Sequence, residues 1–266
     1  MRLILCLLSL IATTALQAAD LSGKESQFHG FRQIDFKHAG RNAKVVFPKE
    51  SAKGKPWIWR ARFFGHEPQT DTELLKRGWH VAYIDVGGLY GAPKALAVWD
   101  DFYQHLTTEH GFHKKPALEG MSRGGLPIFN WAAANPEKVR AIYADAPVCD
   151  IRCWPGGKGT ASGGGRNWTE CLRAYELTEE ESVEAKVSPI HKTDALAKSG
   201  IPILFVVGDA DKAVPVKENT AIMEKAIKAA GGKVKVLHKP GVGHHPHSLN
   251  PPTEIVEFIL NASATQ

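Results

Sequence analysis

The chain has 266 residues, 43% of them hydrophobic, which is enough apolar material for the full core of a single domain. Its formal net charge at pH 7 is +5. No clustered basic stripe or nucleic-acid-binding motif accompanies this mild excess, so we expect no nucleic-acid partner. The charge is compatible with an anionic substrate.

The first 18 residues have the pattern of a secretory signal peptide. Arg2 provides the positive start, residues 3–12 form the apolar segment, and small residues up to Ala18 offer a cleavage site. The apolar segment is too short to span a membrane. We therefore expect residues 19–266 to be one mature domain, secreted or periplasmic, with no membrane contact after cleavage.

Predicted strands and helices alternate along the mature chain. The first two strands form an antiparallel hairpin around Gly40. The strands are expected at residues 33–36, 43–47, 57–60, 80–85, 117–118, 141–144, 203–207 and 234–238, and the helices at 70–77, 94–109, 126–134, 216–230 and 253–260. This alternation predicts an α/β fold with a mostly parallel central sheet and helices on both faces.

The run Gly120-Met121-Ser122-Arg123-Gly124 is a G-x-S-x-G motif between a predicted strand and a predicted helix. That context is typical of a nucleophile elbow, a sharp turn that lifts the serine Oγ above the sheet. Side chains at the two glycine positions are expected to collide with neighbouring backbone. The following helix would direct its N-terminal N–H groups toward an oxyanion near Ser122.

Two later loops supply an acid and a base. Asp211 follows the strand at 203–207, and His244 follows the strand at 234–238. The carboxyl ends of parallel strands meet at the edge of the sheet where α/β proteins bind ligands. The chain order Ser, Asp, His is the order of α/β-hydrolases and differs from that of chymotrypsin or subtilisin. Asp209 is the alternative acid, although it also suits a loop-capping role.

On these motifs the chain resembles the α/β-hydrolase superfamily. It is most similar to secreted bacterial esterase-like members near the dienelactone-hydrolase and prolyl-oligopeptidase-type branches. The resemblance implies that Ser122 is the nucleophile, His244 the general base and Asp211 the buried acid that orients the histidine. It also implies that no cofactor is needed.

The same resemblance implies two oxyanion donors. One is the backbone N–H of Arg123, the residue after the nucleophile. The second should come from the loop after the strand at 57–60, where we expect Arg62, although this loop departs from the His-Gly-Gly-Gly pattern of many esterases.

A glycine-rich region interrupts the alternation at about residues 147–190, where this fold carries lid insertions. Arg152, Trp154 and His245 are candidate substrate contacts, although the tryptophan could simply pack the insertion onto the domain. Two of Cys149, Cys153 and Cys171 are expected to form a disulfide in an exported protein.

His244, His245 and His247 fall within four positions, yet neither an H-E-x-x-H motif nor a Cys/His metal spacing accompanies them, so we expect no metal. The leading hypothesis is a secreted serine hydrolase of carboxylic esters, with acetyl or methyl esters on carbohydrate as substrates. The alternatives are a prolyl-oligopeptidase-type serine peptidase, made less favourable by the lack of a propeller domain, and a catalytically silent envelope binding protein.

Overall fold

The computed structural model describes residues 21–262. The signal peptide predicted for residues 1–18 lies outside the described residues. Within the described part of the chain, no helix is both long and apolar enough to cross a membrane.

A nine-stranded sheet runs through the molecule in the order β1-β2-β3-β5-β4-β6-β7-β8-β9. β1, β2, β3 and β5 pair antiparallel, and all pairs from β5 to β9 along the sheet are parallel. The strands are β1 Lys24–Phe28, β2 Phe31–His38, β3 Arg41–Val46, β4 Trp57–Arg60, β5 His80–Ile84, β6 Ala117–Met121, β7 Ala141–Asp145, β8 Ile203–Gly208 and β9 Val234–Lys239.

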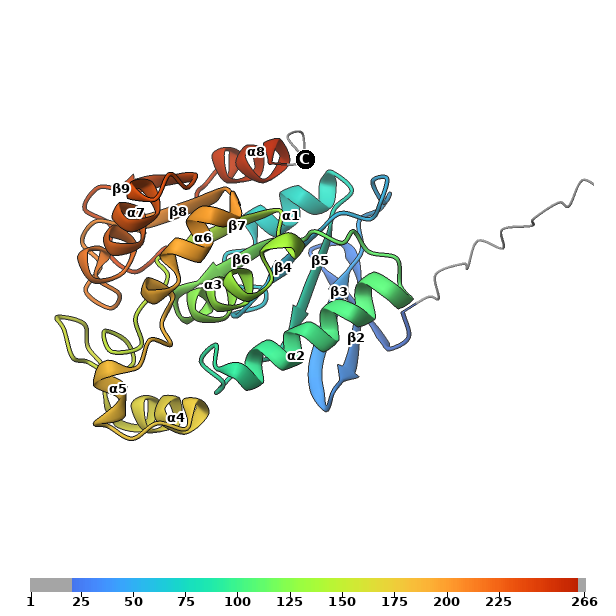
Figure 1. Ribbon diagram of the computed structural model, residues 1–266. Helices are drawn as coiled ribbons and strands as arrows, with labels where there is room; N and C mark the ends of the chain where they lie inside the picture. Colours follow the sequence, from blue (N-terminus) through green and yellow to red (C-terminus); the bar gives the residue numbers. More distant parts are fainter. Residues whose placement is uncertain (1–20, 263–266) are drawn as a thin grey trace, which may run out of the picture.

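Helices cover both faces of this sheet (Figure 1). One apolar layer joins Trp59 of β4 to α2, α3, α6 and α7, and the other joins Ile58 to α1 and α8. Adjacent residues of one strand thus face opposite layers, as a strand buried on both faces requires. The helices are α1 Gln69–Lys76, α2 Pro93–Gln104, α3 Gly125–Ala134, α4 Gly165–Tyr175, α5 Glu181–Glu184, α6 Thr193–Ser199, α7 Thr220–Ala229 and α8 Thr253–Asn261.

The observed architecture is the α/β-hydrolase fold that the sequence predicts, with differences at the element ends. The hairpin turn consists of Ala39 and Gly40, both with positive φ, as a tight two-residue turn requires. β1 adds an edge strand that the sequence pattern did not show, because its side chains are mostly polar and exposed. The helix expected from residue 216 begins as α7 at Thr220, after a single 3₁₀ turn.

The segment between β7 and β8 contains α4, α5 and α6, and α4 and α5 lie together at one end of the molecule (Figure 1). It starts against the nucleophile elbow, because the Val148 N–H donates to the Ser122 carbonyl at 2.9 Å. Val148, Ile151 and Trp168 then pack with Leu126 of α3. This insertion is therefore joined directly to the turn that carries Ser122.

The predicted disulfide is wrong. Cys149, Cys153 and Cys171 are all free and buried. Cys149 lies in the main apolar core, Cys171 is a buried residue of α4, and the Cys153 thiol contacts Glu218. Proximity in sequence therefore did not produce a disulfide among the three residues.

Candidate active site

Ser122 sits at the junction of β6 and α3 with φ of +51°, a left-handed conformation that is unusual for a serine. A Cβ on Gly120 would lie 2.6 Å from the Gly124 carbonyl oxygen, so this glycine is required. The expected collision at Gly124 is wrong, because its nearest neighbour would be the Arg62 Cβ at an ordinary 3.5 Å. Gly125 is the second crowded position, 2.6 Å from the Val148 carbonyl oxygen.

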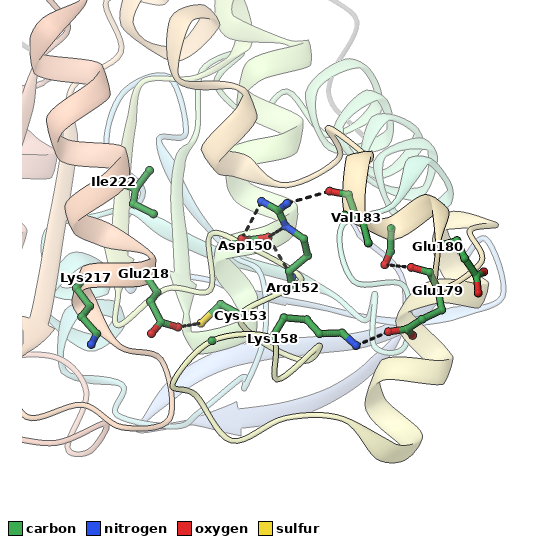
Figure 2. A pocket seen from close by; sticks show the side chains of 12 residues that line it. Asp150, Arg152, Cys153, Lys158, Glu179, Glu180, Val183, Lys217, Glu218 and Ile222 are labelled. Carbon is green, nitrogen blue, oxygen red and sulfur yellow. Dashed lines mark hydrogen bonds and ion pairs between the residues drawn. The ribbon is translucent and has the colours of Figure 1, made fainter.

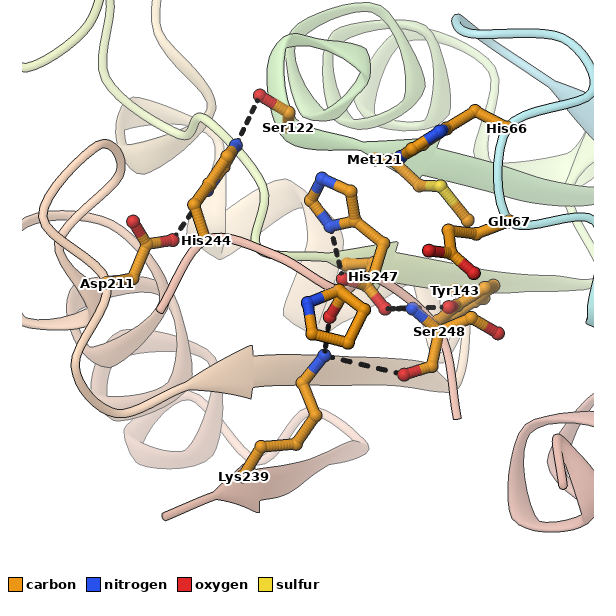
Figure 3. A network of polar contacts seen from close by, with 12 residues as sticks. His66, Glu67, Met121, Ser122, Tyr143, Asp211, Lys239, His244, His247 and Ser248 are labelled. Atoms are coloured by element: carbon orange, nitrogen blue, oxygen red, sulfur yellow. Dashed lines mark hydrogen bonds and ion pairs between the residues drawn. The ribbon is translucent and has the colours of Figure 1, made fainter. Parts of the chain in front are cut away.

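Three side chains from three loops form one hydrogen-bond chain (Figure 3). The Ser122 Oγ lies 3.0 Å from His244 Nε2, and His244 Nδ1 lies 2.7 Å from Asp211 Oδ2. Asp211 fixes the proton of His244 on Nδ1, which leaves Nε2 as the acceptor for the serine hydroxyl. The structure thus brings together the three residues that the sequence assigned to nucleophile, base and acid.

The surroundings of Asp211 favour its ionised form, which accepts the hydrogen bond from His244. Burial opposes its ionisation, but hydrogen bonds from His244 and the Val214 N–H outweigh that effect, so the pKa of Asp211 lies below its ordinary value. Its second oxygen accepts the N–H groups of Ala213 and Val214 at 2.8 and 2.9 Å. Asp209, the alternative acid, instead contacts the exposed His238 at 2.6 Å.

The loop after β4 lies beside the elbow, and a buried arginine of β4 holds it by hydrogen bonds. Arg60 is 1% exposed and donates hydrogen bonds to the carbonyls of Phe63 and His66. Its guanidinium also pairs with the buried carboxyl groups of Asp71 and Glu119. Arg62, the predicted second oxyanion donor, is thereby carried next to Gly124.

Arg123 extends its side chain toward two aromatic rings. Its guanidinium carbon lies 5.6 Å from the centre of the Phe63 ring and 5.0 Å from that of Trp154. Burial and the neighbouring Arg62 lower the pKa of Arg123. Among the described residues Arg123 forms no ion pair, whereas Arg62 pairs with Asp85 at 3.0 Å. Trp154 therefore lies beside the residue that follows the nucleophile.

Arg152 lies elsewhere. Its side chain contacts Asp150 at 3.3 Å and donates to the Val183 carbonyl at 3.0 Å. It lines a hollow of about 660 Å³ that is shown in Figure 2, and Ser122, Asp211 and His244 are not among the lining residues.

His245 belongs to a second group of histidines beside His244. The His245 ring centre lies 5.0 Å from that of His244 and 4.8 Å from that of His247. Burial and then the neighbouring imidazoles lower the pKa of His245. His66, from the loop after β4, lies 5.8 Å from both His245 and His247. No motif in the sequence pointed to His66, Phe63 or Arg60, because their roles depend on contacts between elements that the spacing does not encode.

Solved structures of several hydrolases share this fold. Dipeptidyl peptidase 4 from Porphyromonas gingivalis is 16% identical, with a TM-score of 0.66 over 87% of this chain and 35% of that one. Est1E from Butyrivibrio proteoclasticus is 21% identical, with a TM-score of 0.62 over 91% of this chain and 100% of that one. An S-formylglutathione hydrolase from Agrobacterium tumefaciens is 15% identical, with a TM-score of 0.63 over 91% and 96%.

The chain spans little more than a third of the length of the first peptidases it matches, between 35% and 38%. At these identities the likeness shows the fold. No curated protein matches the chain in sequence.

The sequence model of the prolyl oligopeptidase family matches residues 77–261, a span that includes Ser122, Asp211 and His244. That match and the hydrogen-bonded Ser–His–Asp arrangement support a serine hydrolase as the general class. The chain belongs to the prolyl oligopeptidase family and has the α/β-hydrolase fold.

Proposed function

We propose that the protein is a serine carboxylic-ester hydrolase. The observation that carries this proposal is the continuous hydrogen-bond chain from Ser122 through His244 to Asp211. Ser122 Oγ would attack the ester carbonyl carbon while His244 Nε2 takes the hydroxyl proton. Collapse of the tetrahedral adduct would break the bond to the alcohol, which leaves with the proton from His244. Water activated by His244 would then hydrolyse the acyl-serine.

The negative charge of the tetrahedral adduct requires hydrogen-bond donors that are already in position. We assign this role to the backbone N–H groups of Arg123 and Arg62. Arg123 directly follows the nucleophile in the 3₁₀ turn of residues 122–124. The loop of Arg62 lies against Gly124 and is held by the buried guanidinium of Arg60, so it would need little reorganisation during the reaction.

The proposed substrates are acetyl or methyl esters on carbohydrate that bears acidic groups, outside the cytoplasm. The half-buried Arg123 guanidinium, which contacts the rings of Phe63 and Trp154, is suited to a carboxylate of the sugar chain. Trp154 offers a flat apolar face for a sugar ring. We therefore assign the anion contact to Arg123 in place of Arg152, whose guanidinium already pairs with Asp150.

Substrate charge tests this assignment. Arg123→Met should raise KM about tenfold on an acetylated polyuronate, because a charged hydrogen bond is lost, but not on an acetylated neutral xylan. The substitution keeps the backbone N–H, so kcat on p-nitrophenyl acetate should hold. Arg152→Met is the matched control. Equal effects of the two substitutions on both polymers would refute the anion contact.

A peptidase of the prolyl-oligopeptidase type is the second candidate, and the family match favours it. The likeness to Est1E and to the S-formylglutathione hydrolase, over nearly the whole of both chains, supports the ester proposal. Parallel assays on p-nitrophenyl acetate and on peptide anilides distinguish the two. Faster hydrolysis of anilides would replace the ester proposal, and no hydrolysis of either would favour a catalytically silent binding protein.

A further inference from the structure

Three histidines converge from two separate loops on the side of His244 away from Asp211 (Figure 3 shows two of them, His66 and His247). His66 lies between β4 and α1, and His245 and His247 lie between β9 and α8. Each offers one ring nitrogen, and these nitrogens all lie within 4.8 Å of one another. The three rings stand nearly perpendicular to each other, with interplanar angles of 78° to 88°.

His247 is prepared as a ligand by a buried carboxylate. Its Nδ1 lies 2.7 Å from Asp145 Oδ1, and both side chains are almost completely buried. Asp145 is itself fixed, since its other oxygen accepts the Tyr143 hydroxyl and the Ser248 N–H, each at 2.8 Å. A histidine that bonds a carboxylate through one nitrogen presents the other in a fixed direction and with raised basicity, as metal-bound histidines commonly do.

His244 is not available to this group. Its Nδ1 is occupied by Asp211 and its Nε2 by Ser122. The loop of His66, in contrast, is held near His247 by the hydrogen bond from Arg60 to the His66 carbonyl. The arrangement therefore supplies three imidazoles and leaves the Ser–His–Asp chain intact.

Zinc is the metal that fits a set of three imidazoles. At Zn–N distances near 2.0 Å, the three nitrogens must lie about 3.3 Å apart in a tetrahedral site. The side chains of His66 and His245 are exposed and can turn inward to reach that separation, while His247 remains fixed on Asp145.

Although the sequence led us to expect no metal here, we propose that His66, His245 and His247 bind one zinc ion, which ties the loop after β4 to the loop after β9. Both loops border Ser122, so the ion would fix the two edges of the active site relative to each other. The site does not depend on the proposed ester hydrolysis, and a Ser122→Ala protein should keep it.

Metal binding to the full protein tests the proposal directly. After dialysis against a chelator and then against metal-free buffer, titration calorimetry with Zn²⁺ should give one equivalent bound, and Zn²⁺ should raise Tm. Co²⁺ should bind the same site with the intense visible absorption of a tetrahedral complex. His66→Ala and His245→Ala should each weaken Zn²⁺ binding at least 100-fold and abolish the Co²⁺ band. Both side chains are exposed, so both variants should fold.

His238→Ala is the matched control, since His238 is an exposed histidine of β9 that pairs with Asp209. It should leave binding unchanged. Three results would overturn the proposal: no stoichiometric binding by the unsubstituted protein, binding that survives His66→Ala, or binding lost equally in His238→Ala. Loss of esterase activity in Ser122→Ala with zinc binding retained would show that the two proposals stand separately.

Discussion

At the scale of single residues, the two glycines of the G-x-S-x-G motif have different roles. Gly120 has no room for a side chain, because a Cβ would meet the Gly124 carbonyl and Ile128 at 2.6 Å. Gly124 has helical φ and ψ angles of −66° and −17° and ordinary spacing around it. Within the motif, Gly120 therefore has to be glycine, whereas the position of Gly124 has room for a Cβ.

A matched pair of substitutions checks this difference. Gly120→Ala should lower the free energy of unfolding by about 1–3 kcal/mol through overpacking. Gly124→Ala should be neutral or stabilising by about 0.4–1 kcal/mol, because alanine suits the native backbone and restricts the unfolded chain. Urea unfolding of the two variants measures both values, and equal destabilisation would contradict the steric account.

The Ser–His–Asp chain gives a kinetic prediction. His244→Ala and Asp211→Asn should each lower kcat by about 10³-fold or more on the substrate that the enzyme hydrolyses, since such residues act as a unit. Asp209→Asn should have little effect, because the Asp209 side chain is exposed and pairs with the exposed His238. A larger loss from Asp209→Asn than from Asp211→Asn would show that the acid is wrongly assigned.

Sequence reasoning identified the residues whose position follows from local motifs. Ser122, Asp211 and His244 each follow a predicted strand, and parallel strands bring their ends to one edge of the sheet. It could not identify Arg60 or His66, whose importance comes from contacts across the sheet and between loops. It failed for the cysteines, because the directions of their side chains depend on packing that spacing does not encode.

At the scale of elements, a buried ionic group joins β4, β6 and α1. Arg60, Glu119 and Asp71 come from these three elements, and each is at most 1% exposed. Burial raises the pKa of Glu119 well above its ordinary range despite the neighbouring Arg60. Arg60 thus faces two buried carboxyl groups, one on α1 and one on β6. This ionic group supports the loop that carries Arg62 and His66.

Loss of the Arg60 cation should be costly. Arg60→Met leaves a buried carboxylate without a partner and should destabilise the protein by about 3–5 kcal/mol. Arg32→Met is the control, because Arg32 and Glu25 form an ion pair whose side chains are 48% and 61% exposed. That substitution should cost at most about 1 kcal/mol. Similar midpoints of urea unfolding for the two variants would contradict this account.

The elements that the sequence predicted best are those buried on both faces. β6, β7 and β8 are completely buried, and their apolar runs are distinct in the sequence. α4 and α5 were not predicted, because they follow a glycine-rich stretch and α4 has few buried residues. Their positions depend on Trp168 and Cys171 packing against Tyr90 and Leu126, which are distant in the sequence.

At the scale of the whole molecule, stability in acid depends on the buried side chain of His80. His80 is 2% exposed, and burial lowers its pKa from 6.5 to about 4. The unfolded chain therefore binds a proton between pH 6.5 and 4 that the folded chain does not bind. The contribution of His80 to stability should be complete above pH 6.5, fall as the pH drops to 4, and then level off.

The His80 contribution amounts to about 3 kcal/mol over that interval. His80→Gln removes the titrating group, so its free energy of unfolding should depend less steeply on pH by this amount. Parallel urea titrations of the two proteins at pH 7 and pH 4 measure the difference. Identical pH dependence would show that the pKa of His80 is the same in the folded and unfolded states, and would contradict this account.

The central claim is that Ser122 is a nucleophile activated by His244. An organophosphonate ester forms a stable covalent bond with such a serine, and mass spectrometry of the intact protein and its peptides locates the adduct. We expect one adduct per chain, on Ser122, formed much more slowly in His244→Ala and absent in Ser122→Ala. A folded protein that is not labelled, or one labelled equally well without Ser122, would contradict the account.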